Sequence, residues 1–205
     1  YSSSKGCAEL VTSAYRHSFF SSCDNNALVA SARAGNVIGG GDWAKDRILT
    51  GTKEAASKSD IVYLRNPAAT RPWQHVLEPL SGYLMLGWKL LEEKREFASA
   101  WNFGPEKGNN VTVLDLVKKA QKSWNSIRYD VNKGDHPYEA GSLMLDSTKA
   151  NKLLGWKPVW SFDKTIENTI RWYKQFYEEK HIISRDILND YITDAQKTSS
   201  QWIRI

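Results

Sequence analysis

Residues 28–43 read LVASARAGNVIGGGDW, and this stretch decides the fold class. Its first part, residues 28–34, is a short run of small residues of the kind found in a buried strand of a parallel sheet. A glycine-rich loop from Gly35 to Trp43 follows the strand. Taken alone, this loop is either a flexible turn or a place where the backbone approaches a ligand closely. The stretch therefore indicates a parallel sheet and leaves the role of the loop open.

Helices and strands alternate on both sides of this stretch. We expect strands at 61–65 and 100–104, candidate short strands at 127–131 and 143–145, and an irregular loop at 66–75, which contains two prolines. Helices are expected over residues 2–21, 46–58, 77–94, 113–124 and 163–180, and a brief helix is expected to end at Gly155. Because strands alternate with helices, the sequence predicts an α/β protein with a parallel sheet.

Several helices also show which face should be buried and where they begin. Apolar residues at core-facing spacing in helix 77–94 are Leu80, Leu84, Trp88 and Leu91. The corresponding stripe of helix 163–180 is Phe162, Ile166, Ile170, Tyr173 and Tyr177, and that of helix 2–21 is Cys7, Val11, Ala14 and Ser18. Thr112 is the expected cap of helix 113–124, and Ser161 or Asp163 caps helix 163–180.

Composition excludes several classes of protein. The 205 residues are 41% hydrophobic and 25% charged, as in an ordinary soluble globular domain, and no apolar run approaches the ~20 residues of a membrane span. Two cysteines make no disulfide scaffold, so we expect a reducing compartment, the cytoplasm. The net charge of +5 is spread along the chain, so a nucleic-acid partner is not expected. The four histidines lack ligand spacing, so no metal site is expected either.

The first five residues, YSSSK, place Tyr1 and Lys5 on one face of a helix. An ammonium group near a phenol favours the phenolate, which makes a tyrosine usable as a base near neutral pH. The pattern matches by chance in many helices, so a purely structural pair is the alternative. Tyr1 is not preceded by Met, and we expect the chain to be part of a longer protein.

Several unrelated motifs follow in a fixed order: ARAGNVIGGGDW at 32–43, RNPAATRPWQHV at 65–76, AWNFGP at 100–105 and LGWKP at 154–158. With the YSSSK helix, this order resembles the extended, sugar-nucleotide branch of the short-chain dehydrogenase/reductases, over essentially the whole chain to about residue 180. Within the branch, segments 35–44 and 65–76 look most like the enzymes that dehydrate CDP-glucose.

The resemblance implies the latter part of a Rossmann-type parallel sheet plus a small mixed α/β substrate-binding lobe. Residues 1–60 would then be the C-terminal part of an NAD-binding domain. Residues 61–180 would be mainly the sugar-nucleotide lobe with returning Rossmann elements, and residues 181–205 a tail of ambiguous structure.

The resemblance also implies NAD that stays bound and is recycled, and it assigns roles to particular residues. Tyr1 would take the proton of the sugar C4 hydroxyl, Lys5 would hold the nicotinamide ribose, and Val37 would touch the nicotinamide through its main chain. Asn36 would bind the substrate near its diphosphate, and Arg71 would bind the diphosphate itself, since a guanidinium can bridge two phosphate oxygens. A solvated surface arginine is the alternative for Arg71. Further substrate contacts are expected from Arg47, Val62, Tyr63, Leu64, His136 and Glu139.

The implied partners are a nucleotide sugar, with CDP-glucose first, and further copies of the protein in a homodimer or higher homo-oligomer. The glycine fingerprint that grips the NAD pyrophosphate and the second acid/base set of the branch do not occur in these 205 residues, so we expect the chain alone to be inactive. Two rivals remain: another epimerase or dehydratase of the branch, and a catalytically inactive module that binds a sugar nucleotide.

Overall fold

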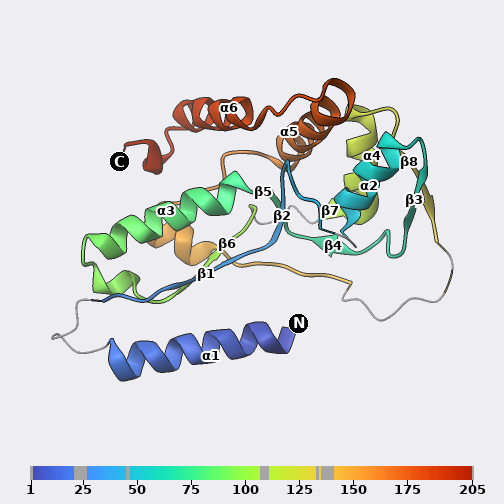
Figure 1. Ribbon diagram of the computed structural model, residues 1–205. Helices are drawn as coiled ribbons and strands as arrows, with labels where there is room; N and C mark the ends of the chain where they lie inside the picture. Colours follow the sequence, from blue (N-terminus) through green and yellow to red (C-terminus); the bar gives the residue numbers. More distant parts are fainter. Residues whose placement is uncertain are drawn as a thin grey trace.

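The computed structural model describes residues 2–20, 27–44, 47–106, 111–132, 134 and 141–204 (Figure 1). The α-helices are α1 (Ser2–Phe19), α2 (Ile48–Ser57), α3 (Leu77–Leu91), α4 (Val113–Ser123), α5 (Phe162–Lys174) and α6 (Ser184–Lys197). The strands are β1 (Ser31–Ala34), β2 (Asn36–Ile38), β3 (Ile61–Leu64), β4 (Thr70–Arg71), β5 (Trp73–His75), β6 (Ala100–Phe103), β7 (Val111–Thr112) and β8 (Arg128–Val131). Short helical turns are η1 (Arg95–Phe97), η2 (Ala150–Leu154), η3 (Gln175–Glu179) and η4 (Gln201–Arg204).

The strands pair in twos, and most pairs are parallel. β1 pairs with β6, β2 with β5 and β3 with β8 in parallel, whereas β4 and β7 are antiparallel. β5 lies beside the end of β6, because Gln74 Nε2 donates a 2.8 Å hydrogen bond to Phe103 O. Parallel strands joined through helices confirm the predicted α/β class.

The segment that decides the fold differs in detail from its prediction. Strand structure covers only 31–34 of the predicted 28–34 and resumes at 36–38, inside the expected loop. Gly35 separates the two strands and fits closely, because a Cβ at this position would lie 2.6 Å from Pro72 O.

Two of the other predictions about strands were wrong. Residues 66–75, expected to be irregular, contain β4 and β5 on either side of Pro72. The ring leaves Pro72 without an N–H, but its carbonyl still accepts from Asn36 N at 3.0 Å, so proline fits between two short strands. Residues 143–145 are not a strand, and pairing there is limited to an isolated bridge between Thr70 and Ser142.

The larger core lies among α2, α4, α5 and α6. Ile166, Ile170 and Tyr173 of α5 are at most 1% exposed, so the predicted stripe of this helix is confirmed at its centre. The ambiguous tail includes α6, whose Ile187 and Tyr191 are buried in the same core. A second hydrophobic cluster joins α3, β6 and the short helical turns η1 and η2. Its buried members are Met85, Leu86, Phe97, Trp101, Phe103, Ala150, Leu154 and Trp156.

The buried face of α3 is not the one predicted. Its expected stripe points outward, with exposed fractions of 44% for Leu80, 76% for Leu84, 46% for Trp88 and 82% for Leu91. The opposite face is buried and includes Gly82, where an added Cβ would lie 2.3 Å from the Phe103 ring. The missing side chain at Gly82 lets this helix approach β6 closely.

Glu78 on the buried face of α3 joins three parts of the chain. Its carboxylate accepts hydrogen bonds from Val159 N at 2.9 Å, Trp160 N at 2.8 Å and the Tyr191 hydroxyl at 2.9 Å. Burial raises the pKa of the Glu78 carboxyl to about 7, although all three donors favour the charged form. The buried Glu78 carboxylate of α3 is therefore hydrogen-bonded to Tyr191 of α6.

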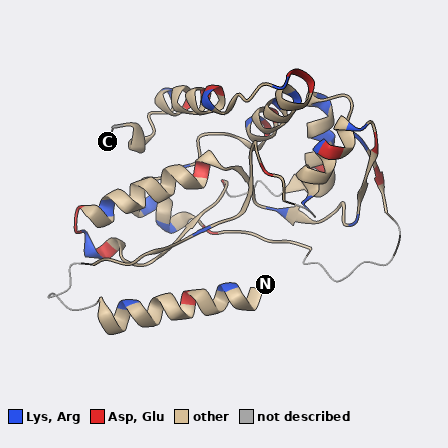
Figure 2. Ribbon diagram, in the orientation of Figure 1, with Lys and Arg blue, Asp and Glu red and all other residues tan. Residues whose placement is uncertain are grey.

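α1 lies alongside β1 and buries no residue (Figure 1). Its described links to the chain are polar: Arg16 Nε donates to Val29 O at 2.9 Å, and Glu9 accepts from the Ser31 hydroxyl at 2.8 Å. Lys, Arg, Asp and Glu are interspersed along the helices (Figure 2). In the part of the chain that the structure describes, no helix is long and apolar enough to cross a membrane.

Candidate functional site

Asn36 and Val37 lie half-buried on β2, and the strand pairing brings them close to the Arg71 segment. Asn36 stands opposite Trp73 in the parallel register, and Arg71 lies two positions before Trp73. The glycine-rich loop leaves β2 at its carboxyl end, which is the end of parallel strands where α/β proteins bind ligands. The structure therefore brings Asn36 close to the Arg71 segment at the amino end of β2, whereas the 39–43 loop lies at the other end of the same strand.

Arg71 is half-buried on β4, where it stands opposite Val111 of β7. Its Nη1 donates a 2.8 Å hydrogen bond to Thr70 O, which fixes one side of the guanidinium against its own strand. A guanidinium has five N–H donors in a planar fork, so it suits recognition of a diphosphate. This position is compatible with the predicted role.

Residues 39–43 form a loop held by α5. The Tyr173 hydroxyl accepts from Asp42 N at 2.9 Å and lies 2.9 Å from Gly39 O and 3.1 Å from Asp42 O. Gly40 passes so close to Trp172 that an added Cβ would lie 2.2 Å from the indole, and Gly41 has a φ of +79°. Burial raises the pKa of Tyr173 to about 12, so its hydroxyl keeps the proton that it donates. The loop is thus held in one defined conformation.

Lys53 of α2 is a second support of this loop, and it was not among the residues predicted for the site. The side chain is 1% exposed, its Nζ donates to Asp42 O, and the ammonium lies 3.6 Å from the centroid of the Trp43 ring and 4.1 Å from that of Tyr173. Burial lowers the pKa of Lys53 to about 8, against the opposing effect of nearby acids. Its spacing from Leu49 and Ala56, both buried, could have revealed a lysine on the apolar face of a helix.

Arg47 directly precedes α2 and is largely exposed. Its Nη1 pairs with Asp42 Oδ2 at 3.0 Å, and the other oxygen of that carboxylate accepts from Ala44 N at 2.9 Å. Arg47 is therefore coupled to the glycine-rich loop through Asp42.

Val62, Tyr63 and Leu64 belong to a different strand pair from Asn36 and Arg71. Leu64 is fully buried in the larger core, and its carbonyl accepts from Asn132 N at 2.9 Å. Tyr63 is 59% exposed. Because β8 occupies one edge of this strand, backbone contacts with a nucleotide base would use the other edge.

Lys5 is exposed near the beginning of α1. Its helix reaches the rest of the chain by way of β1, so the described contacts do not bring Lys5 to Asn36 or Arg71. The predicted residues Tyr1, His136 and Glu139 lie outside the described residues.

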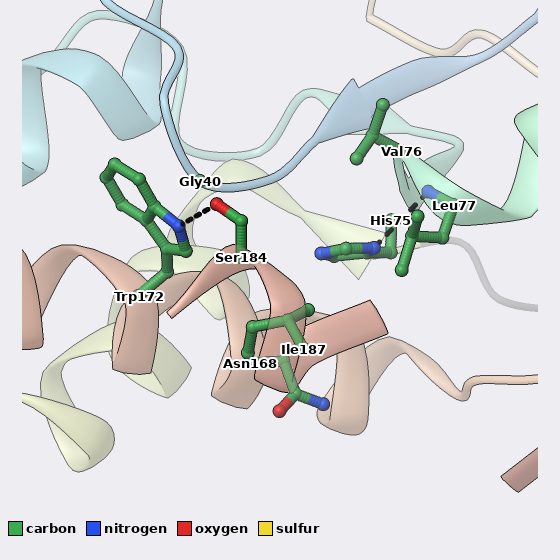
Figure 3. A pocket seen from close by; sticks show the side chains of 8 residues that line it. All are labelled: Gly40, His75, Val76, Leu77, Asn168, Trp172, Ser184 and Ile187. Atoms are coloured by element: carbon green, nitrogen blue, oxygen red, sulfur yellow. Dashed lines mark hydrogen bonds between the residues drawn. The ribbon is translucent and has the colours of Figure 1, made fainter. Parts of the chain in front are cut away.

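A cavity of about 110 Å³ lies between the end of β5 and helices α5 and α6 (Figure 3). His75 lies in its wall with Nδ1 3.3 Å from Leu77 N, and its ring packs edge-on against Trp160 at 4.8 Å. Burial lowers the pKa of His75 to about 4, so the ring is neutral at physiological pH. The cavity lining includes Gly40 of the loop but none of the predicted site residues. Among the described residues, no three His, Cys, Asp or Glu side chains gather as metal ligands.

Comparison with known proteins finds a matching family and a protein of similar sequence. A family model described as GDP-mannose 4,6 dehydratase matches residues 1–169. The CDP-glucose 4,6-dehydratase of Salmonella typhimurium is 43% identical over 199 residues, which cover 94% of this chain and 55% of that protein. The chain therefore spans little more than half the length of this relative.

Two solved structures show the same fold. The UDP-glucuronic acid 4-epimerase of Bacillus cereus, in complex with UDP-glucuronic acid and NAD, has a TM-score of 0.67 at 19% identity and aligns over 82% of this chain and 50% of its own. The dTDP-glucose 4,6-dehydratase of Bacillus anthracis, in complex with NAD, has a TM-score of 0.65 at 20% identity over 87% of this chain and 53% of its own. These likenesses confirm the predicted fold class.

Proposed function

This chain belongs to the GDP-mannose 4,6-dehydratase family, and we propose that it forms the part of a CDP-glucose 4,6-dehydratase that carries the catalytic Tyr1–Lys5 pair and much of the sugar-nucleotide site. The observation that carries the proposal is the 43% identity with the Salmonella CDP-glucose 4,6-dehydratase over nearly the whole chain. In the structure, the glycine-rich loop at the carboxyl end of β2 and the pairing of Asn36 next to the Arg71 segment support it.

The proposed reaction uses NAD, which when bound would supply the hydride acceptor for C4 of the sugar and the hydride donor for C6 once water is lost across C5 and C6. Tyr1 removes the proton of the C4 hydroxyl. Lys5, which is exposed near the beginning of α1, binds the ribose hydroxyls and lowers the pKa of the Tyr1 phenol. The exposed Lys5 and the half-buried Val37 are compatible with a chain that forms only part of a dinucleotide site.

The proposed substrate contacts divide into a diphosphate group and a nucleotide group. Arg71 binds the diphosphate, Asn36 hydrogen-bonds next to it, and Arg47 adds a second positive charge at the end of the loop. The edge of β3 at Val62, Tyr63 and Leu64, together with His136 and Glu139, contacts the nucleoside. We also propose a homo-oligomer, which the exposed apolar side chains on α1 support, and we propose the cytoplasm as its compartment.

The activity is tested by incubating the full-length protein that contains this chain with CDP-glucose and NAD and by identifying the product by mass spectrometry and NMR. Loss of one water with formation of a 4-keto sugar is expected. A sugar of unchanged mass but inverted C4 would instead favour the epimerase rival, and binding without conversion would favour the inactive module. GDP-mannose, UDP-glucose and dTDP-glucose serve as competing substrates. Tyr1→Phe should abolish conversion with CDP binding unchanged.

The diphosphate assignment is tested with Arg71→Lys. The variant should weaken the binding of CDP by about 1.5–3 kcal/mol, the range for a hydrogen bond to a charged group. CMP, which has a single phosphate, should be affected less. Equal affinities of wild type and variant for CDP, measured by calorimetry, would contradict the assignment.

A further inference from the structure

Lys53 and Tyr173 together hold the glycine-rich loop, and we call this pair the loop clamp. We infer that the loop clamp positions Arg47 for the substrate, so that both members are positioning residues of the sugar-nucleotide site. The inference rests on the proposed function, because Arg47 has a role only if the chain binds a nucleotide sugar. Neither residue belongs to the predicted catalytic or substrate-binding set.

The loop clamp acts on main-chain groups of the loop. The Tyr173 hydroxyl contacts three of them, Gly39 O, Asp42 N and Asp42 O, at 2.9, 2.9 and 3.1 Å. Lys53 Nζ donates to Asp42 O as well. Since Lys53 comes from α2 and Tyr173 from α5, the loop is fixed from two sides of the core at the same residue.

Asp42 transmits this constraint to Arg47. Its main chain is held by the loop clamp, while its carboxylate pairs with Arg47 at 3.0 Å and accepts from Ala44 N at 2.9 Å. The Arg47 side chain is 61% exposed, so Asp42 is the main described restraint on its direction. An arginine held in this way loses less conformational freedom when it binds a phosphate.

The burial of the Lys53 ammonium group carries a cost in desolvation free energy. Removing a charge from water costs several kcal/mol unless partners compensate, and here the compensation comes from one carbonyl, the faces of the Trp43 and Tyr173 rings and the charges of two nearby acids. An apolar side chain of similar length would fill the same volume without that cost, and such replacements often leave stability unchanged or higher. Lys53 therefore fits a role in placing the loop better than a role in overall stability.

The experiment measures CDP affinity by calorimetry and melting temperature for the wild type, Lys53→Met, Tyr173→Phe and the control Lys58→Met. Lys58 is an exposed residue just beyond the same helix. Both clamp variants should raise the Kd for CDP about tenfold, which corresponds to the loss of one buried hydrogen bond. The melting temperature of Lys53→Met should stay the same or rise, and Lys58→Met should match the wild type in both measurements. Should Lys53→Met fail to fold, Tyr173→Phe, which lacks only a hydroxyl, decides in the same way.

A second arm repeats Lys53→Met in an Arg47→Ala background. If the loop clamp acts through Arg47, the lysine substitution should have little further effect there, since coupled residues are not additive. Equal CDP affinity in the wild type and both clamp variants would overturn this inference and leave the proposed function intact. A loss that persists in full without Arg47 would overturn it too. A wild-type protein that binds no CDP would instead contradict the proposed function.

Discussion

α5 and α1 are both amphipathic helices, yet they contribute very differently to this molecule. The centre of α5 is enclosed, with Ile166 0% exposed and Ile170 1% exposed. α1 is longer but has no buried residue, and its apolar side chains remain open, with Leu10 72% exposed and Phe19 59% exposed. The difference shows that an amphipathic pattern sets which face of a helix is apolar, whereas burial depends on which partner the chain supplies.

The two helices also support different parts of the proposed site. α5 holds the glycine-rich loop through Tyr173, so this loop is anchored on the larger core. α1 carries Lys5 and is attached through polar contacts of Glu9 and Arg16. Lys5 of the proposed catalytic pair thus lies on the loosely held helix, whereas the glycine-rich loop lies against the tightly held one.

The largest difference between the two regions should appear on truncation of a core side chain. Ile166→Ala should lower the free energy of unfolding by about 2–5 kcal/mol, because it leaves a cavity in a closed core. Leu10→Ala on α1 should change it by less than about 0.5 kcal/mol, as is usual for an exposed site. Urea denaturation of the two variants measures both values. Similar losses would show that α1 is packed more firmly than the structure indicates.

The enclosed Glu78 gives the well-packed region a dependence on pH. Because burial raises its pKa from 4.5 to about 7, the folded state holds this proton more tightly than the unfolded state does. The stability that Glu78 contributes is therefore fully present below pH 4.5 and is lost as the pH rises through about 7. Between pH 5 and 8, the free energy of unfolding should fall by on the order of 2–3 kcal/mol from this group.

Glu78→Gln removes the titration and serves as the test of its source. Its unfolding free energy, measured by urea denaturation across the same pH range, should change less than that of the wild type. Identical pH profiles for the two proteins would mean that the fall comes from other groups.

A smaller effect is expected at the first turn of α5. The Ser161 hydroxyl accepts from Lys164 N at 3.3 Å, and removal of such a cap costs about 1 kcal/mol. Ser161→Ala should lower the unfolding free energy by about that amount and speed amide exchange in the first turn of α5. Thr112→Ala, which removes the corresponding cap of α4, is the matched comparison. Loss of exchange protection along all of α5 would show that the cap has a wider role than proposed.

The smallest change in global stability is expected at the attachment of α1. Glu9 accepts from the Ser31 hydroxyl at 2.8 Å and lies 3.7 Å from Arg33 Nε. Glu9→Ala should alter the global free energy by no more than about 1 kcal/mol, since exposed ion pairs contribute little. Amide exchange of α1 should nevertheless become faster, because the helix loses a link to β1. Unchanged exchange in α1 would show that other contacts hold it.

Local patterns predicted the parts of the fold that depend on neighbouring residues. The Thr112 hydroxyl caps α4 by accepting from Asp115 N at 3.0 Å, and Gly155 ends its short helix with a φ of +66°. The stripe of α5 is buried at Ile166, Ile170 and Tyr173. Each of these features lies within one turn of helix or one face of it, so sequence spacing is sufficient to find it.

Features that depend on distant partners were not predicted. The buried face of α3 depends on the close approach of Gly82 to Phe103 and on the hydrogen-bond donors around Glu78. These partners are distant in the sequence, so the periodicity of the helix does not reveal them. Lys53 was passed over because a lysine is normally a surface residue, and its aromatic neighbours come from other segments. The roles assigned to Asn36, Arg47 and Arg71 stay predictions that measurements of ligand binding will test.

The order in which the chain can assemble follows from the parallel strand pairs. Ser31 pairs with Ala100, and Ile61 pairs with Arg128, so each pair must close a long stretch of chain before its first hydrogen bond forms. α4 and α5, by contrast, form by local contacts on a much faster timescale. Refolding should therefore show early helix formation and a slower phase, on the millisecond-to-second scale of non-local topologies, in which the strands meet. The glycine-rich loop, which needs β2, α2 and α5 together, would take its final shape only in that slow phase.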